Sequence, residues 1–235
     1  MYERLQKSEV AKYYTEHYPK MMAFWQDNVR DPRPLLFQKM GIKSKRVLDL
    51  GCGNGLLVND LLNDNDVHGV DISTNILTEA QGLGIKTILA DFDSNFPFVR
   101  NYFDVILASD VLEHSFSPKL LLGRMATILN DNGVIYMTTP NAQYPNRIFM
   151  IQRALESALE NIYGEDIPID AKRFPDINIL EIAEIRCISQ AVGLEALSIN
   201  GWSWKWEKMD ENEKDYLWKN PNSAENLLVT LVKGT

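Results

Sequence analysis

The stretch RVLDLGCGNGLLVNDLL, residues 46–62, places glycines at positions 51, 53 and 55 between two apolar runs. Glycine adopts backbone conformations that other residues avoid, and it leaves room for another group to approach the main chain. The first run has the composition of a buried strand, and the glycines are followed by the start of a helix. This segment therefore predicts a strand, a tight turn and a helix, with a ligand in contact with the backbone of the turn.

Further apolar segments continue this alternation of strands and helices. The predicted strands are residues 46–50, 67–70, 86–90, 103–108, 133–138, 194–199 and 227–232. Their near-continuous apolar character is typical of parallel strands that helices cover on both faces. The predicted fold class is therefore α/β, with a doubly wound parallel sheet.

Capping residues and glycines predict helices between these strands. They lie within residues 73–84, 117–133 and 176–193, and begin at Ser73, Ser117 and Asp176. Two segments lie outside the alternation: a helical cap at residues 1–40 and a helical insertion at residues 142–175, after the fifth strand. The insertion has apolar residues at helical spacing, namely Ile148, Ile151, Leu155, Leu159 and Ile162. We interpret both segments as lids over a site, with additional cover for the core as the alternative.

Length and composition indicate one domain. The chain has 235 residues, of which 45% are hydrophobic, and this is enough for one large core. Within a single domain at 1–235 we expect the N-terminal cap at 1–40, a ligand-binding core at 41–141, the insertion at 142–175, and the last helix with two strands at 176–235.

Charge and cysteine usage exclude several classes of protein. A formal net charge of −8 argues against extended contact with nucleic acid. No apolar run approaches the ~18 residues of a membrane span, and the first thirty residues do not resemble a signal peptide. Cys52 and Cys187 lack the spacing of a zinc site. We therefore expect a cytoplasmic protein without a membrane span and without a metal site.

The glycine turn and Asp49 indicate a cationic ligand. A dinucleotide fingerprint reads GxGxxG, whereas this turn reads GCGNGL, with Leu56 in place of the last glycine. The GxxxxGK[ST] pattern of a phosphate-binding loop does not occur. Asp49 lies at the end of the first strand, where its carboxylate would repel a phosphate and attract an ammonium or sulfonium group.

Acidic residues also follow the next two strands. Asp71, which Ile72 follows, ends the second strand, where a carboxylate can accept both hydroxyls of a ribose. Asp91 and Phe92 follow the third strand and offer a polar and apolar slot for adenine. One ligand combines a cation, a ribose and adenine. The predicted cofactor is therefore S-adenosylmethionine, with S-adenosylhomocysteine as its product.

Several segments resemble a known enzyme family. VLDLGCGNG, VDIS, ADF, FDVILASDVLEH and GVIYMTTPN occur in an order and spacing similar to those of the class I S-adenosylmethionine-dependent methyltransferases. The resemblance covers residues 44–141 and resumes through the last helix and two strands. It implies a Rossmann-like sheet of seven strands in the order 3-2-1-4-5-7-6, with the seventh strand antiparallel. The LEH and TPN segments look most like the small-molecule branch that includes ubiquinone-type O-methyltransferases.

The resemblance also implies roles for individual residues. In many of these enzymes a His-x-Arg-Phe segment precedes the last helix, but here Ala171 stands at the histidine position. The cofactor-binding residues that the resemblance implies are Asp49 and the backbone of Gly51, Cys52, Gly53 and Gly55 by the methionine moiety, Asp71 with Ile72 next to it at the ribose, Asp91 and Phe92 at adenine, and Ser109 beside the methionine portion. For Cys52 we favour a small packing residue over a nucleophile.

His114 is the candidate for proton transfer. It follows the fourth strand in a loop that should face the sulfonium, and an imidazole exchanges protons near neutral pH. Tyr13 and Tyr14 could close over the cofactor, and Trp202 and Trp204 could form an aromatic wall for the acceptor. For each of these residues simple packing is the alternative.

The predicted function is methyl transfer to an oxygen or, second, a nitrogen of a small organic molecule. Methylation of nucleobase amino groups usually goes with a D/NPPY motif after the fourth strand, where this chain reads SDVLEH. The alternatives are a methyltransferase that acts on nucleic acid or protein, an NAD-dependent oxidoreductase, and a non-catalytic cofactor-binding protein.

Overall fold

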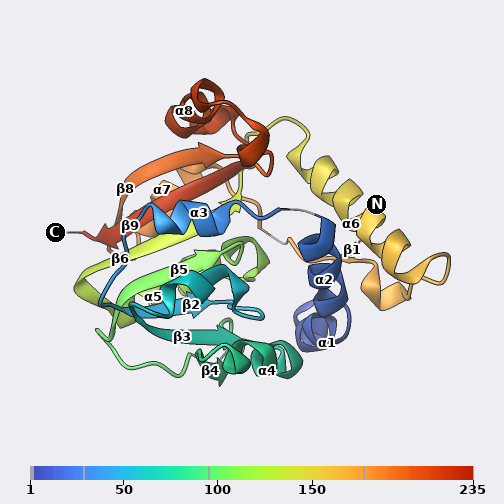
Figure 1. Cartoon of the computed structure of the whole chain (residues 1–235), viewed down its shortest axis with the longest axis horizontal. Coiled ribbons are helices and arrows are strands. Elements are labelled where there is room, and N and C mark those ends of the chain that lie inside the picture. The colour runs from blue at the N-terminus through green and yellow to red at the C-terminus, as the bar shows by residue number, and fades with distance from the viewer. Residues whose placement is uncertain (1–2, 29, 95, 177, 235) are drawn as a thin grey trace.

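The computed structural model describes residues 3–28, 30–94, 96–176 and 178–234, and of residue 174 it describes the backbone alone. A seven-stranded sheet lies at the centre, in the order β4-β3-β2-β5-β6-β9-β8 (Figure 1). The strands are β2 (Arg46–Leu50), β3 (Asp66–Asp71), β4 (Lys86–Leu89), β5 (Phe103–Ser109), β6 (Leu129–Pro140), β8 (Leu194–Trp202) and β9 (Asn226–Lys233). All pairs are parallel except those of β9, which is antiparallel to β6 and β8. This topology confirms the predicted Rossmann-like fold and its strand order.

Helices cover both faces of the sheet (Figure 1). They are α3 (Arg33–Gln38), α4 (Thr74–Gly82), α5 (Pro118–Ile128), α7 (Ile182–Gln190) and α8 (Glu211–Lys219), with 3-10 helices η2 (Leu56–Leu61), η3 (Leu112–His114), η5 (Trp206–Lys208) and η6 (Pro221–Ser223). Side chains alternate between the faces, as the period of a strand requires. Leu48 packs with α5 and α7 in one core cluster, whereas Val47 packs with α3 and η2 in the other.

The N-terminal segment and the insertion pack against each other. The elements involved are β1 (Glu3–Arg4), η1 (Lys7–Glu9), α1 (Val10–Glu16) and α2 (Tyr18–Asn28) on one side, and α6 (Arg147–Tyr163), η4 (Ile169–Ala171) and β7 (Arg173–Phe174) on the other. β1 pairs in parallel with β7, and α1, α2 and α6 share a third core cluster. We call residues 3–28 and 147–174 the cap; it lies at the right of the sheet in Figure 1.

Three predicted helix boundaries differ from the structure. The helix at 117–133 ends at Ile128, because β6 begins at the next residue. The helix predicted from Asp176 begins at Ile182, because Glu181 forms a capping box with Glu184; position 177 lies outside the described residues. The glycine turn leads into a 3-10 helix, in which N of Val58 donates to O of Gly55 over 3.2 Å. That helix is too short and tight to supply the row of N–H groups that an α-helix start would offer.

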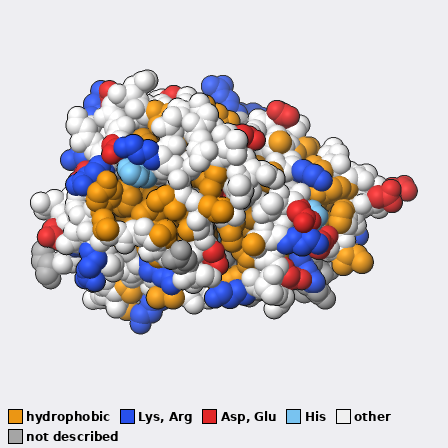
Figure 2. Space-filling model, turned by 90° about the horizontal axis from the view of Figure 1, so that it is seen from below, with side chains coloured by type: hydrophobic (Ala, Val, Ile, Leu, Met, Phe, Trp, Pro, Cys, Tyr) orange, Lys and Arg blue, Asp and Glu red, His pale blue; other side chains and the backbone are white. Residues whose placement is uncertain are grey.

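The described part of the chain contains no helix with both the length and the apolarity needed to cross a membrane. On the face that Figure 2 shows, positive and negative side chains are interspersed around an apolar band. This face therefore carries no large surface of a single sign.

Candidate active site

Polar residues gather where parallel strands end. β2, β3, β5 and β6 are parallel, so their carboxyl ends share one edge of the sheet, where ligands bind in doubly wound folds. Asp49 is the second-to-last residue of β2, Asp71 is the last residue of β3, and Ser109 is the last residue of β5. The structure thus brings these three predicted residues to one edge.

The glycine turn has three left-handed residues. Gly51, Gly53 and Gly55 have φ angles of +72°, +51° and +81°, a region that residues with a Cβ rarely occupy. A Cβ at Gly53 would lie 3.2 Å from Cε of Met22 in α2, so the turn lies directly below the cap. Burial raises the pKa of the Cys52 thiol, which supports a packing role for Cys52 and not a nucleophilic one.

Asp49 is a buried carboxylate without a partner. It is 1% exposed, and neither of its oxygens accepts a hydrogen bond from a described residue. Burial raises the pKa of Asp49 to about 7, with the Arg33 guanidinium acting against the rise and Asp71 adding to it. A bound cation would supply the partner that this carboxylate lacks.

Asp49 makes the stability of the ligand-free protein depend on pH. The folded state keeps its proton up to about pH 7, whereas the unfolded chain loses it near pH 3.8; stability therefore falls as the pH rises between these values. Asp49→Asn cannot ionise, so its stability gain over the wild type should be greater at pH 8 than at pH 5, by at most about 3 kcal/mol. Calorimetric unfolding at both pH values measures this, and an equal difference at both would contradict it.

Asp71 holds the glycine turn to the end of β3. Its Oδ2 accepts from N of Gly53 over 3.0 Å, and its Oδ1 accepts from N of Ser73 over 2.9 Å. Burial raises the pKa of Asp71, while these backbone donors oppose the rise. Each carboxylate oxygen can accept more than one hydrogen bond, so the group keeps capacity for two ligand hydroxyls. Ile72 beside it is half-buried.

In the turn after β4, the carboxylate of Asp91 accepts hydrogen bonds from residues of the same turn. Asp91 accepts from N of Asp93 over 2.8 Å and from Oγ of Ser94 over 2.5 Å. Phe92 packs half-buried against the core, and its carbonyl oxygen accepts a hydrogen bond from Arg124. The two residues that the resemblance assigns to adenine therefore lie just beyond β4, with local partners for Asp91.

The sequence did not single out Arg33, which the structure places at the site. Its Nη1 donates to Oδ2 of Asp110 over 2.7 Å, just after β5, and Asp31 binds the rest of the guanidinium. Burial lowers its pKa, but Asp110 and Asp31 raise the pKa of Arg33 above its ordinary value. Nearby, Oγ of Ser109 is buried without a partner. In the sequence, Arg33 lies within the segment DPRP, residues 31–34, whose two prolines indicate a break between helices.

His114 lies against a segment far away in the sequence. Its Nδ1 is 3.1 Å from O of Pro175 and 3.4 Å from Oδ1 of Asp176. A carbonyl oxygen only accepts, so Nδ1 carries the proton and Nε2 of the neutral ring is left as an acceptor.

The adjacent Glu113 is 1% exposed and accepts from Oγ1 of Thr139 over 3.2 Å. Burial raises the pKa of Glu113 well above its ordinary value, and the negative charges of Asp110 and Asp176 raise it further.

The two predicted lid tyrosines have different surroundings. Tyr13 is 1% exposed within the cap core. The ring of Tyr14 lies 5.9 Å from that of His114, edge to face, and its hydroxyl is buried without a hydrogen-bond partner. Tyr14 is therefore the cap residue that faces the candidate base. Ala171 is fully buried in the same cluster as Tyr13, so a histidine at this position would overpack the cap core.

Trp202 and Trp204 differ in how deeply they are buried. β8 extends to Trp202, which is fully buried and whose Nε1 donates to O of Leu227 over 3.2 Å. This placement gives Trp202 a role in the core, in place of the predicted aromatic wall for an acceptor. Trp204 is half-buried, and the Arg33 guanidinium lies 5.0 Å from the centroid of its ring. Trp204 therefore supports the site through Arg33.

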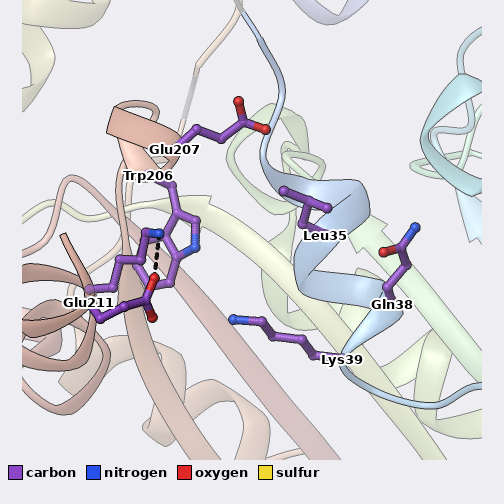
Figure 3. Close-up of a pocket in the computed structure, with 7 residues that line it drawn as sticks. Leu35, Gln38, Lys39, Trp206, Glu207 and Glu211 are labelled. Atoms are coloured by element: carbon purple, nitrogen blue, oxygen red, sulfur yellow. Dashed lines mark hydrogen bonds and ion pairs between the residues drawn. The ribbon is translucent and has the colours of Figure 1, made fainter. Parts of the chain in front are cut away.

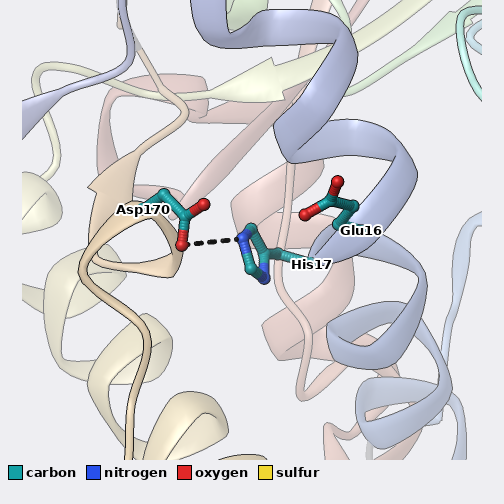
Figure 4. A group of neighbouring side chains, drawn as sticks. All are labelled: Glu16, His17 and Asp170. Atoms are coloured by element: carbon teal, nitrogen blue, oxygen red, sulfur yellow. Dashed lines mark ion pairs between the residues drawn. The ribbon is translucent and has the colours of Figure 1, made fainter.

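A group of possible metal-ligating side chains lies within the cap. Glu16, His17 and Asp170 each offer one atom, and these atoms lie within 4.8 Å of one another (Figure 4). Nζ of Lys12 is 2.5 Å from Asp170 and 3.8 Å from Glu16, so a cation of the chain itself neutralises the acids. We interpret the group as an ionic bridge between the two halves of the cap.

A surface pocket of about 380 Å³ lies between α3 and the start of α8 (Figure 3). Its residues are Leu35, Gln38, Lys39, Trp206, Glu207, Glu211 and Lys214. None of them belongs to the groups described above; Lys214 pairs with Glu211, and Glu207 pairs with Arg30. This pocket is separate from the strand-end site.

Comparisons with known proteins agree with this geometry. A family model described as a methyltransferase domain matches residues 42–200, more than half of the chain. The ubiquinone biosynthesis O-methyltransferase of Azoarcus sp. is 25% identical over 171 residues, which cover 70% of each protein. That of Coxiella burnetii is 29% identical over 121 residues, 48% of this chain and 51% of the relative. The chain thus spans only about half the length of this second relative.

Solved structures show the same fold. The 1,6-didemethyltoxoflavin-N1-methyltransferase of Burkholderia thailandensis, crystallised with its namesake compound and S-adenosylhomocysteine, is 14% identical, with a TM-score of 0.64 over 97% of this chain and 88% of that one. The strand order, the glycine turn and the acids at the strand ends agree with the family match. The chain belongs to the methyltransferase-domain family and is a class I S-adenosylmethionine-dependent methyltransferase.

Proposed function

We propose that this enzyme methylates a hydroxyl oxygen or, second, an amine nitrogen of a small organic molecule. The observation that carries the proposal is the position of His114, whose Nδ1 is held by Pro175 and Asp176 while Tyr14 of the cap lies over its ring. A base held in this way under a cap suits an acceptor that is small enough to be enclosed. The names of the curated relatives support an oxygen acceptor.

The residues at the strand ends fit the cofactor. The unpartnered carboxylate of Asp49 suits the cationic methionine portion, and the left-handed glycines leave its approach to the backbone open. We assign the carboxylate of that portion to Arg33, a half-buried guanidinium that pairs with Asp110 at the same edge. The remaining proposed contacts are the backbone of Gly51, Cys52, Gly53 and Gly55, Asp71 and Ile72 at the ribose, Asp91 and Phe92 at adenine, and Ser109.

When bound, the cofactor would supply an electrophilic methyl group, whose bond to sulfur breaks to leave S-adenosylhomocysteine. The chain itself has to position the acceptor and manage its proton. Nε2 of His114 accepts the hydroxyl proton as the acceptor oxygen forms its new bond. The carboxylate of Asp176, 3.4 Å from Nδ1, stabilises the imidazolium that results. Tyr14 and the rest of the cap exclude water from this step.

A small acceptor also agrees with the charge of the chain. The net charge is −8, and the face in Figure 2 carries interspersed charges and no basic band. Binding of a nucleic acid would require a concentrated positive surface.

The proposal is tested by incubating the protein with S-adenosylmethionine labelled in its methyl group and with separate pools of cellular small molecules, RNA and protein. We expect label in the small-molecule pool. Asp71→Ala serves as the inactive control, because it should lose the cofactor. Label that enters only the RNA pool or only the protein pool would overturn the proposed class of acceptor.

A further inference from the structure

Arg147, the first residue of α6, is a buried cation with few partners. It is 8% exposed, and its Nη2 donates to Oδ1 of Asn226 over 2.5 Å. Among the described residues its Nε, which is buried, has no hydrogen-bond partner, and the same holds for Nδ2 of Asn226, a residue that is 1% exposed at the start of β9. Two adjacent side chains, one from the cap and one from the sheet, therefore keep unused donors.

No carboxylate in the described part of the chain pairs directly with this guanidinium. Among the ion pairs of the described residues, none includes Arg147, and the nearby Glu225 instead accepts from Oγ of Ser203 over 2.8 Å. Burial lowers the pKa of Arg147, while the charges of Glu225, Asp110 and Asp176, none of them in an ion pair with it, oppose this. An unpaired buried cation is costly, so an anionic oxygen is the partner that this geometry lacks.

Arg147 belongs to the acceptor side of the site. Its partner Asn226 is paired with Pro140 at the carboxyl end of β6, and the preceding residue of that strand, Thr139, donates to Glu113 next to His114. Arg33, by contrast, is half-buried and pairs with Asp31 and Asp110, and its charge opposes the rise in the pKa of Asp49 beside the glycine turn. The two guanidiniums therefore divide the site between the cofactor and the acceptor.

We propose that Arg147 and Asn226 bind a carboxylate of the methyl acceptor, so that the acceptor is an organic acid whose carboxylate lies away from the methylated atom. The inference rests on the proposed small-molecule function. A guanidinium presents parallel N–H groups that match the two oxygens of a carboxylate. Nδ2 of Asn226 adds a third donor, which selects an oxygen anion over a cation or an apolar group.

The test is calorimetric titration of the protein saturated with S-adenosylhomocysteine. The probes are matched acids and amides: benzoate and benzamide, 3,4-dihydroxybenzoate and 3,4-dihydroxybenzamide, phenylacetate and phenylacetamide. We expect at least one acid to bind the wild type about tenfold or more tightly than its amide. Arg147→Gln should weaken binding of that acid by about 10- to 100-fold, as for the loss of a charge-assisted hydrogen bond, and leave S-adenosylhomocysteine binding unchanged.

A second variant remains informative if Arg147→Gln does not fold. Asn226→Asp places a carboxylate next to Arg147 and removes a donor that has no partner in the free protein. It should keep or raise the melting temperature and weaken binding of the acid about tenfold or more.

The proposal is overturned if no acid of the panel is preferred over its amide, or if the folded variants bind the acid as the wild type does. It is also overturned if Arg147→Gln weakens binding of S-adenosylhomocysteine and not that of the acid, since Arg147 would then serve the cofactor. A different result would contradict the proposed function, namely that no small molecule becomes labelled in the experiment with methyl-labelled S-adenosylmethionine.

Discussion

Replacement of Asp71 by alanine is expected to weaken binding of S-adenosylhomocysteine by about 100-fold or more. Two charge-assisted hydrogen bonds to the ribose hydroxyls would be lost, each worth about 1.5 to 3 kcal/mol. The glycine turn would also lose the acceptor that holds N of Gly53 at 3.0 Å. Calorimetric titration measures the change. Asp71→Asn should lose less, because an amide retains one accepting oxygen.

Asp66 provides the matched control for this experiment. It lies at the opposite end of the same strand, β3, where its carboxylate pairs with Nζ of Lys86 at the surface over 2.6 Å. Asp66→Asn should leave the affinity for S-adenosylhomocysteine within about twofold of the wild type, since exposed ion pairs contribute at most ~1 kcal/mol to stability. If Asp71→Ala bound as tightly as this control, Asp71 would not be the ribose ligand.

His114→Ala is expected to lower kcat by about 100- to 10,000-fold at neutral pH, the usual contribution of a positioned general base. Binding of S-adenosylhomocysteine should not change, because His114 contacts Pro175 and Tyr14 and is not one of the proposed cofactor contacts. The defect should shrink as the pH approaches the ionisation range of the acceptor, because an ionised hydroxyl needs no base. Steady-state kinetics with the acceptor found in the labelling experiment give kcat at each pH.

The control here is His68→Gln, since His68 lies within β3 and its ring packs on Tyr102 and Phe103. This variant should keep most of kcat once it is folded. Added imidazole should partly restore the activity of His114→Ala by filling the space of the missing ring. A kcat for His114→Ala close to that of the control, at every pH, would assign His114 to packing.

The proposed cofactor contacts and the proposed acceptor contacts come from different elements of the chain. The family match spans residues 42–200; it includes the strand ends with most of the proposed cofactor residues and also Arg147, but not Asn226. The proposed acceptor residues come from the cap and from β9, where Arg147 of α6 meets Asn226. A change of acceptor can therefore leave the cofactor side intact, as expected when function resides in a site added to a common fold.

The sequence by itself determined the strand positions, the glycine turn and the acids at the strand ends. These signals are local: a buried strand is a short apolar run, a left-handed turn needs glycine, and a parallel strand delivers its last residue to one edge of the sheet. The strand order came from the resemblance, and the structure confirmed it.

Only the tertiary structure decided which side chains meet across the site. Arg33 reaches Asp110 over 77 positions, His114 reaches Pro175 over 61, and Arg147 reaches Asn226 over 79. The sequence likewise left Trp202 between a wall of the site and the core, and packing placed it in the core. Local patterns set how each segment folds, but the partner of a buried charge depends on which segments the hydrophobic core brings together, and that is a property of the whole chain.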